Sequence, residues 1–223
     1  KDTIKKHVIS DAKIGVALSS GLDSRSICAI LSLLKKKNKI IKAYFVEFEN
    51  YNLEKDEVIK FFKNFKIKLE IIEIKPKDII RKFESCIRHN ESPLGGIMNI
   101  GLFKLCEKVK KDKLKVILGG YGLDEALGGY DILNPNNFSS GATKTVRLID
   151  GTILDNNKMI SRGKKKSKIN KKKFILNDKS IHQKQIDLLF QDKIPRTLHM
   201  VDRFSMSSSI EFRNPYIDLD FVK

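Results

Sequence analysis

The sequence predicts an α/β fold in which a parallel β-sheet is covered by helices on both faces. Short stretches rich in β-branched and aromatic residues recur along the first half of the chain, and segments with helical spacing of apolar residues separate them. Strands that alternate with helices form parallel sheets through right-handed crossovers. The length of 223 residues suits one sizeable domain with a buried core.

Each predicted element rests on its residue pattern. The strands are short runs of mainly apolar residues that cover residues 13–18, 40–48, 68–74 and 114–118. In the first helix the apolar residues Ile27, Ile30, Leu31 and Leu34 recur at helical spacing. The third helix follows Pro76, which is well suited to a first helical turn. The helices cover residues 23–37, 54–65, 77–88, 97–112, 181–190 and 195–209.

The chain divides into three predicted parts. Residues 1–130 contain the alternating strands and helices and form the core. Residues 131–180 are rich in Lys, Asn, Ser and Gly, and we expect a long, mobile loop excursion there with little core of its own. Residues 181–223 regain helical spacing and are expected to pack back on the core as C-terminal helices.

The net charge of +17 raises the question of nucleic-acid binding. Much of the basic excess lies between Lys158 and Lys184, a run with Phe174 as its one aromatic residue. Binders of single strands interleave cations with several aromatic stacking residues. The pattern therefore argues against nucleic acid and favours a solvated loop that attracts anions.

The cysteine and hydropathy patterns indicate a cytoplasmic protein. Cys28, Cys86 and Cys106 form no C-x-x-C pair, and their odd number argues against a disulfide framework. We expect them to be small buried apolar residues in a reducing compartment. No stretch of about 18 uncharged apolar residues predicts a membrane span, and the first residues show no signal-peptide pattern.

An anion-binding turn is predicted between the first strand and the first helix, in the octet LSSGLDSR of residues 18–25. The backbone N–H groups of such a turn and the helix dipole favour a phosphate. Ser19 and Ser24 add hydroxyl donors, whereas Asp23 suits the site only as a ligand of a magnesium ion that bridges phosphates. The alternative is a simple capped turn in which Asp23 or Ser24 is the N-cap.

A second glycine-rich turn follows the fourth strand, with the sequence LGGYGLDE at residues 118–125 and GGY at 128–130. Ligands of parallel sheets bind beyond the carboxyl ends of the strands, so we expect both turns at the same edge. Asp23 and Asp124 then converge and offer the oxygen ligands that a divalent cation needs. The alternative is that these glycines only make tight turns.

A third motif covers residues 198–206 (LHMVDRFSM) and 210–218 (IEFRNPYID). Our physical interpretation of this segment is mainly structural. Asp202, Arg203, Glu211 and Arg213 are expected to form one buried ion-pair network that holds a helix against the sheet.

Together these motifs resemble those of the asparagine synthase family. The octet is similar to the L-S-G-G-x-D-S-S pyrophosphate loop of ATP pyrophosphatases, and the second motif to L-S-G-x-G-x-D-E-x-x-G-G-Y. The third resembles V-D-R-x-S-M and E-x-R-x-P-[FY]-[LI]-D, and between the first two ESPL at 91–94 weakly resembles D-E-P-F. The resemblance covers nearly the whole chain outside residues 131–193 and implies an adenine nucleotide alpha hydrolase-like (ATP pyrophosphatase) fold.

The resemblance also implies ATP, Mg²⁺ and a set of site residues. Asp23 and Asp124 are the implied magnesium ligands. The implied nucleotide-binding residues are Leu18, Ser19, Ser20, Gly21, Asp23, Ser24, Val46, Gly119 and Gly120.

Several residues depart from the family patterns. Ser20 stands where the loop usually has a second glycine, and Arg25 replaces a serine; Arg25 either adds a charge to the pyrophosphate or points to solvent. Tyr121 occupies a position that is usually acidic. The β-lactam and carbapenam synthetases have a tyrosine there in a catalytic base pair, so the alternatives for Tyr121 are a general base or a packing residue.

The implied function is that of an ATP-dependent carbon–nitrogen ligase. A small-molecule carboxylate would be adenylated with release of pyrophosphate and then captured by ammonia or an amine, giving an amide and AMP. Family members carry an N-terminal glutaminase domain and a C-terminal active-site lysine, and we expect both to be missing from this chain. The alternatives are an amide or lactam synthetase of secondary metabolism or surface-glycan assembly, and a catalytically incomplete nucleotide-binding fragment.

Overall fold

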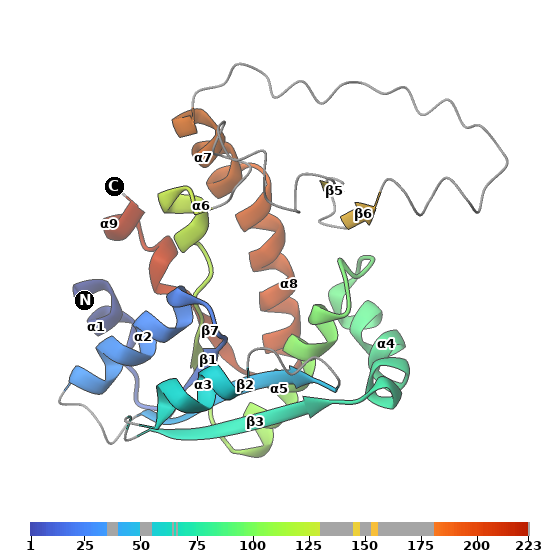
Figure 1. Ribbon diagram of the computed structural model, residues 1–223, viewed down its shortest axis with the longest axis horizontal. Helices are drawn as coiled ribbons and strands as arrows, with labels where there is room; N and C mark the ends of the chain where they lie inside the picture. Colours follow the sequence, from blue (N-terminus) through green and yellow to red (C-terminus); the bar gives the residue numbers. More distant parts are fainter. Residues whose placement is uncertain are drawn as a thin grey trace, which may run out of the picture.

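Five parallel strands form the main sheet in the order β3-β2-β1-β4-β7 (Figure 1). The computed structural model describes residues 1–34, 40–49, 55–63, 65, 67–129, 145–147, 153–155 and 181–222. The strands of the sheet are β1 (Ile14–Leu18), β2 (Ile40–Phe48), β3 (Lys68–Ile74), β4 (Val116–Leu118) and β7 (Glu211–Arg213). The predicted α/β fold with a parallel sheet is confirmed.

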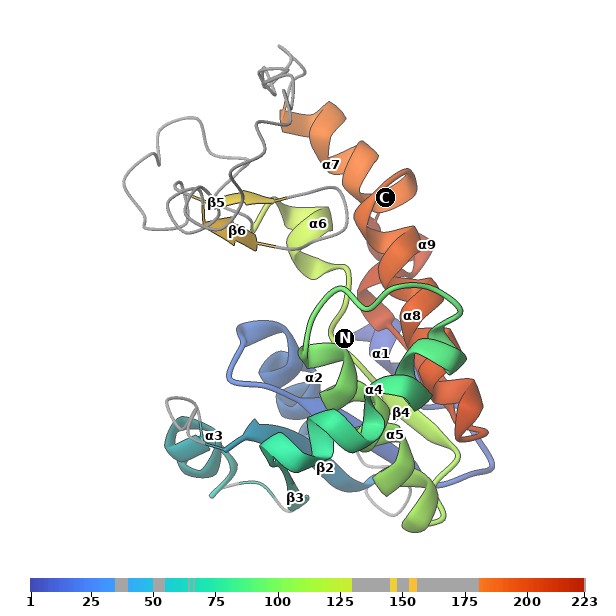
Figure 2. The ribbon, with the colours of Figure 1, turned by 90° about the vertical axis from the view of Figure 1, so that its right-hand side faces the viewer.

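Helices connect and flank these strands (Figures 1 and 2). From the N-terminus they are α1 (Asp2–His7), α2 (Leu22–Leu33), α3 (Lys55–Phe62), α4 (Pro76–Asn90), α5 (Met98–Lys111) and α6 (Leu123–Leu127). The C-terminal part adds α7 (Ile181–Phe190), α8 (Lys193–Ser207), a 3₁₀ turn (Pro215–Ile217) and α9 (Leu219–Val222). Helix α8 packs against α4, α5 and β7, and α7 packs against α6 and α8.

The sheet reverses its direction of growth at β1. Strands β2 and β3 continue it on one side, and β4 and β7 on the other. In an open parallel sheet such a switch point leaves a crevice beyond the carboxyl ends of the two central strands, and ligands bind there. By this rule the crevice is expected beyond Leu18 and Leu118, where the two glycine-rich turns begin.

Two hydrophobic clusters cover the two faces of the sheet. One joins β1 and β2 to helices α1, α2 and α3 and includes Ile27, Phe45 and Val58. The other joins the sheet to α4, α5 and α8 and includes Phe103 and Phe204. The alternation of side chains along a strand sends neighbouring residues to opposite faces, and this alternation fixes which strand residues face which helices.

A polar network ties the strands together near their amino ends. Asp112 accepts hydrogen bonds from Tyr44 Oη at 2.8 Å, from Lys42 Nζ at 2.7 Å and from Lys108 Nζ at 3.1 Å. Glu70 pairs with the same two lysines. Burial by itself raises the pKa of Asp112, but these donors outweigh it and hold that pKa at about 2.

Strand β7 was not predicted from the sequence. It has three residues, Glu211 to Arg213, and both of its ends are charged, so it shows no hydrophobic periodicity. Its backbone pairs with β4, with Val116 opposite Glu211 and Leu118 opposite Arg213. Helix α1 is likewise too short to give a clear periodic signal.

The predicted excursion at residues 131–180 lies outside the described residues, apart from two short strands. These are β5 (Thr145–Arg147) and β6 (Ile153–Asp155), which form an antiparallel pair. The three cysteines are buried and unpaired, as expected.

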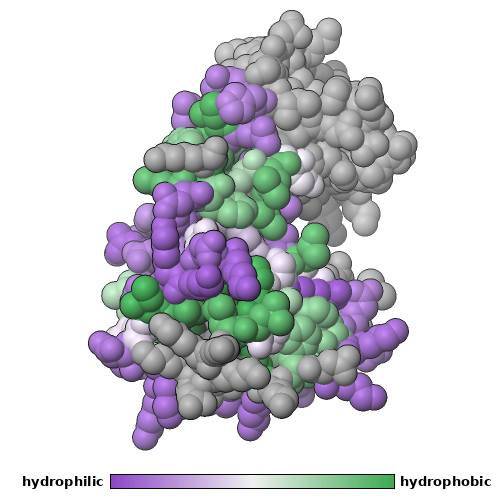
Figure 3. All heavy atoms as spheres, turned by 90° about the vertical axis from the view of Figure 1, so that its left-hand side faces the viewer, coloured by the Kyte–Doolittle hydropathy of each residue, from purple (hydrophilic) through white to green (hydrophobic). Residues whose placement is uncertain are grey.

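Within the described ranges, every helix is too short or too polar to cross a membrane. Figure 3 shows the face at the left of Figure 1, where apolar side chains form separate patches among hydrophilic ones. Scattered apolar patches of this kind are ordinary on protein surfaces and point to no particular partner.

Candidate nucleotide site

The two predicted turns meet in the structure. A β-carbon added at Gly120 would lie 3.1 Å from the Ser24 amide nitrogen and 3.2 Å from the Asp23 β-carbon. Such contacts are tighter than ordinary side-chain packing allows. The glycine therefore lets the turn after β4 approach the start of α2, and residues about 100 positions apart in the chain share one site.

Two serines close the turn after β1. The Ser19 amide donates to Ser24 Oγ at 2.9 Å, and the two hydroxyl oxygens lie 3.0 Å apart. Ser19 Oγ also accepts a hydrogen bond from the Gly21 amide at 3.1 Å. Ser24 is buried, so its hydroxyl holds the shape of the turn while the first turn of α2 stays at the crevice.

Acidic residues gather where the turns meet. Burial raises the pKa of Asp23, and the nearby negative charges of Asp124 and Glu125 raise it further. Gly129 makes room for Asp124, because a β-carbon at that position would overlap the Asp124 carboxylate. Gly122 opens α6 with φ of +105°, a conformation that suits glycine. The glycines thus allow Asp124 to be placed near Asp23.

This set of donors fits a magnesium ion that is shared with phosphates. No group of three or more His, Cys, Asp or Glu side chains that could hold a metal occurs within the described ranges. Mg²⁺ usually takes one or two carboxylates and completes its shell with phosphate oxygens and water. Two mutually repelling carboxylates beside an anion-binding turn are what such an arrangement needs.

Glu125 and Lys193 are site residues that the sequence reasoning missed. The Glu125 side chain is only 5% exposed, and Lys193 Nζ lies 3.5 Å from its Oε1. Lys193 is the first residue of α8, where the helix dipole disfavours a cation. This pair joins the C-terminal helices to the acidic end of the site, and no local pattern around either residue predicts it.

Tyr121 packs against the sheet rather than standing free in the crevice. Its ring lies 5.9 Å from the ring of Phe212, and it belongs to the edge of the cluster beside α5 and α8. Burial raises the pKa of Tyr121 to about 12. A base role would therefore need a bound cation to lower this pKa.

Arg25 follows neither of the two expectations for it. Its guanidinium pairs with Glu57 of α3 at 3.0 Å and lies over the Phe61 ring at 5.4 Å. The side chain is thus held between α2 and α3 and not directed to bulk solvent or to the phosphate turn. Ser20 is half-buried in the turn.

The end of β2 contributes two neighbouring residues to the same edge. Val46 lies against α5, because a β-carbon at Gly101 would be 3.0 Å from Val46 Cγ1. The next residue, Glu47, is a buried carboxylate that the sequence reasoning did not single out. Glu47 lies in a segment whose pattern predicts an ordinary strand, and that pattern does not reveal the burial of its carboxylate.

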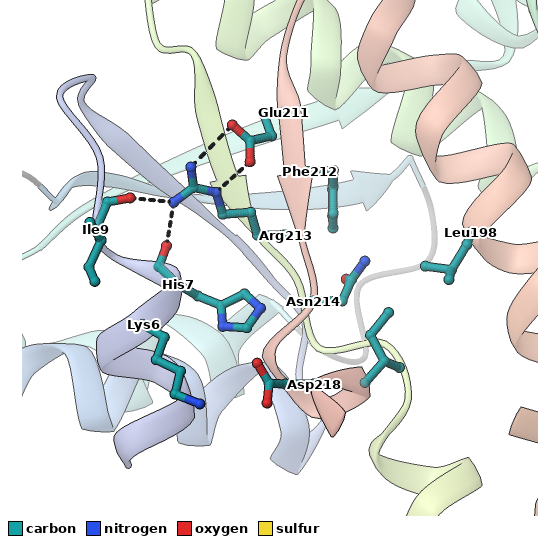
Figure 4. A pocket seen from close by; sticks show the side chains of 10 residues that line it. Lys6, His7, Ile9, Leu198, Glu211, Phe212, Arg213, Asn214 and Asp218 are labelled. Carbon is teal, nitrogen blue, oxygen red and sulfur yellow. Dashed lines mark hydrogen bonds and ion pairs between the residues drawn. The ribbon is translucent and has the colours of Figure 1, made fainter. Parts of the chain in front are cut away.

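The predicted ion-pair network of the third motif is wrong. Arg203 pairs with Glu91 at 2.7 Å on the surface, and its neighbour Asp202 is exposed. Arg213 instead pairs with Glu211 and donates to the backbone carbonyls of His7 and Ile9 (Figure 4). Because the helix and the strand turn their charges to different neighbours, two separate and partly exposed groups replace the network.

A cavity of about 530 Å³ lies on the other side of the second turn, between α1, β7 and α8 (Figure 4). Phe212 and Asn214 line it, and a β-carbon at Gly119 would overlap the Phe212 ring. The Asn214 side-chain oxygen is buried and has no hydrogen-bond partner in the part of the chain that the structure describes. The second turn therefore approaches lining residues of this cavity at Gly119 and Gly122, and it approaches Asp23 at Gly120.

Comparisons with known proteins identify the family of the chain. The model of the asparagine synthase family matches residues 1–223. Asparagine synthetase [glutamine-hydrolyzing] 1 of Bacillus subtilis is 30% identical over 133 residues, which are 59% of this chain and 20% of that protein. Asparagine synthetase [glutamine-hydrolyzing] 3 of the same organism is 22% identical over the whole chain and 40% of its own length.

Two further similar proteins carry other names. The amidase chry2 of Gibberella zeae is 24% identical over 62% of this chain and 22% of its own length. The chain thus spans about a fifth of the length of the first curated relatives that it matches. The solved ammonia-dependent NAD synthetase of Campylobacter jejuni is similar at 19% identity and a TM-score of 0.39, covering 58% of this chain and 56% of its own. By the full-length match to the family model, the chain belongs to the asparagine synthase family.

Proposed function

We propose that the chain is the ATP-binding part of an ATP-dependent, amide-forming synthetase. Membership of the asparagine synthase family supports this class of enzyme. The observation that carries the proposal to particular residues is the contact between the two turns at Gly120. That contact sets the anion-binding turn of α2 beside two acidic side chains, Asp23 and Asp124.

In this proposal the phosphates of ATP lie on the turn of residues 18–24. Backbone N–H groups of the turn and the N-terminus of α2 bind and orient them. Leu18, Val46, Gly119 and Gly120 border the nucleoside. When bound, the magnesium ion neutralises phosphate charge, and Asp23 and Asp124 are the residues that hold it.

The reaction that this arrangement suits is adenylation of a small-molecule carboxylate. The carboxylate oxygen attacks the α-phosphorus, the bond to the bridging oxygen breaks, and pyrophosphate leaves. Ammonia or an amine then attacks the acyl-adenylate and releases AMP as the amide forms. The protein's contribution is mainly to orient the reactants and to balance their charge.

Tyr121 is our candidate for the group that takes a proton from the attacking amine. It lies three residues before Asp124, in the turn that approaches α2. With its pKa raised by burial, the phenol can act as a base only if the metal and its neighbours lower that pKa. If Tyr121 only packs on Phe212, the amine is ammonia or is deprotonated by another group.

Calorimetry of magnesium-dependent nucleotide binding tests the proposal. We expect Asp23→Ala and Asp124→Ala each to weaken binding of ATP in magnesium by at least about tenfold, since each removes one of two metal ligands. Asp56→Ala is the matched control, because Asp56 is an exposed acid in the first turn of α3. Wild-type affinity in both site variants would refute the assignment.

Exchange of labelled pyrophosphate into ATP, run with a panel of carboxylates, separates the alternatives. An active synthetase shows exchange with at least one carboxylate, and a catalytically incomplete fragment binds ATP without exchange. The identity of the amine that then yields an amide separates ammonia-using enzymes from the synthetases of secondary metabolism or surface glycans. Salt-sensitive binding of bulk RNA without nucleotide binding would point to the basic-module alternative.

A further inference from the structure

Glu47 has an unusual environment for a carboxylate. It lies one residue before the end of β2, and its side chain is 4% exposed. Its Oε2 lies 2.7 Å from Lys55 Nζ, whereas its Oε1 is buried without a hydrogen-bond partner among the described residues. A carboxylate oxygen that is removed from water and left without a hydrogen bond is costly, so Oε1 is a candidate acceptor for a donor group on a ligand.

Its position places Glu47 at the edge of the proposed site. The last residue of β1, Leu18, is in register with Phe45, so Glu47 lies two residues beyond the point where the phosphate turn begins. At the usual spacings of parallel strands, its backbone is on the order of 8 Å from that of Leu18. A nucleoside attached to phosphates on that turn reaches this distance.

The face of the sheet is also the appropriate one. Side chains alternate along β2, so Glu47 lies on the same face as Phe45, which packs against α2 and α3. Helix α2 carries the phosphate turn on that face. The first turns of α2 and α3 are joined there by the pair between Arg25 and Glu57, and Lys55 comes from the same turn of α3.

The chemistry of the orphan oxygen limits what binds it. A carboxylate oxygen only accepts hydrogen bonds, so the ligand atom must be a donor. Lys55 already compensates the charge of Glu47, so a neutral donor is favoured over a second cation. On a nucleotide the neutral donors are the ribose hydroxyls and the amino group of the base, and the hydroxyls are the ones nearer to the phosphates.

We propose that Glu47 recognises the ribose of the bound nucleotide by accepting a hydrogen bond from one of the ribose hydroxyls. The inference rests on the proposed function, since it requires that a nucleotide binds at the phosphate turn. An acidic residue plays the corresponding role after the second strand in other doubly wound sheets. Lys55 is then a positioning residue that holds the Glu47 carboxylate at the edge of the sheet.

The test compares ATP with its 2′-deoxy and 3′-deoxy analogues by calorimetry in magnesium. Wild type should bind ATP about 10- to 100-fold more tightly than one of the deoxy analogues, the usual range for a hydrogen bond to a charged group. Glu47→Met should bind ATP as weakly as that analogue and lose the preference. Glu47→Gln, which keeps an acceptor oxygen, should retain part of it.

Matched variants separate ribose binding from a structural role. Glu73→Met is the control, because Glu73 is the register neighbour of Glu47 on β3 and its side chain is 51% exposed. It should leave the preference for ATP unchanged. Lys55→Met should weaken the preference. If Glu47 only anchored α3, the substitutions Glu47→Met and Lys55→Met would lower the affinity for all three nucleotides equally.

The outcomes also separate this inference from the proposed function. Wild type that binds no nucleotide overturns both. Wild type that binds ATP and both deoxy analogues equally well overturns the ribose contact alone. A preference that persists in both Glu47 variants also overturns it. Purine riboside triphosphate lacks the amino group of the base. If wild type binds this analogue more weakly than ATP but binds the deoxy analogues as tightly as ATP, Glu47 contacts the base and not the ribose.

Discussion

Gly120→Ala is the substitution that tests most directly whether contact between the two turns creates the site. Its β-carbon would lie 3.1 Å from the Ser24 amide nitrogen and 3.2 Å from the Asp23 β-carbon, below the 3.4 Å at which ordinary contact begins. The first of these neighbours is backbone, so the methyl group must push the two turns apart by about 0.3 Å. Gly120 has no positive φ, so strain of its own backbone plays no part.

The size of the expected effect on ATP affinity depends on whether the strain is present in the free or in the ligand-bound protein. Overpacking of this kind costs about 1–3 kcal/mol. Without ligand the two turns can separate, so little of that cost appears in the free energy of unfolding. A nucleotide with magnesium must draw Asp23 and Asp124 together again, because metal–oxygen distances near 2.1 Å tolerate little change. We therefore expect the affinity for ATP in magnesium to fall by about 10- to 100-fold.

Gly15→Ala is the matched control for overpacking. Its β-carbon would lie 2.9 Å from the Tyr44 ring and 3.2 Å from Leu114, inside the sheet and away from the crevice. We expect it to lower the free energy of unfolding, measured by urea with circular dichroism because the chain has no tryptophan, and to leave nucleotide affinity unchanged. If Gly120→Ala binds ATP like wild type, the contact between the turns does not build the site.

Three further predictions concern other parts of the molecule. Asp112→Asn should lower the free energy of unfolding by about 2 kcal/mol at pH 7. Since the folded pKa of Asp112 is about 2, below its usual 3.8, the difference in free energy of unfolding between wild type and variant should shrink between about pH 4 and pH 2 in urea titrations. In a protein active in amide formation, Tyr121→Phe should keep pyrophosphate exchange but slow amide formation by about 10²- to 10⁴-fold; an unchanged rate in a quenched-flow assay leaves Tyr121 a packing residue. Lys193→Met should destabilise the fold by about 1–3 kcal/mol by removing one partner of buried Glu125. Lys193→Met combined with Glu125→Gln should recover part of that loss, whereas simple additivity in chemical unfolding would show that the pair does not interact.

Much of the fold was predictable because its signals are local. Four of the five strands of the main sheet lie in apolar runs of the sequence, and the helices between them have clear periodicity, so the alternation of elements and the parallel sheet followed. The rule that ligands bind beyond the carboxyl ends of parallel strands then directed attention to two turns with Gly and Asp. The structure confirms that these turns meet.

The features that only the tertiary structure decided are long-range. Strand β7 exists because β4 offers it an unpaired backbone edge, and three residues with charged ends give no periodic signal. The charges of the third motif were assigned to one network, yet Arg203 reaches Glu91 and Arg213 reaches the N-terminal segment, because each guanidinium pairs with whichever acceptor the packing brings near.

The same reason separates the predicted from the unpredicted site residues. A strand, a turn or a capped helix is determined by neighbours in the sequence, so a pattern reports it, and the residues 18–24 and 118–124 were found in this way. The burial of Glu47 and the pairs Glu47–Lys55 and Glu125–Lys193 depend on how α3 and α8 dock on the sheet. The electrostatic environment of a side chain is set by distances in space and by removal from water, and local sequence patterns predict neither quantity.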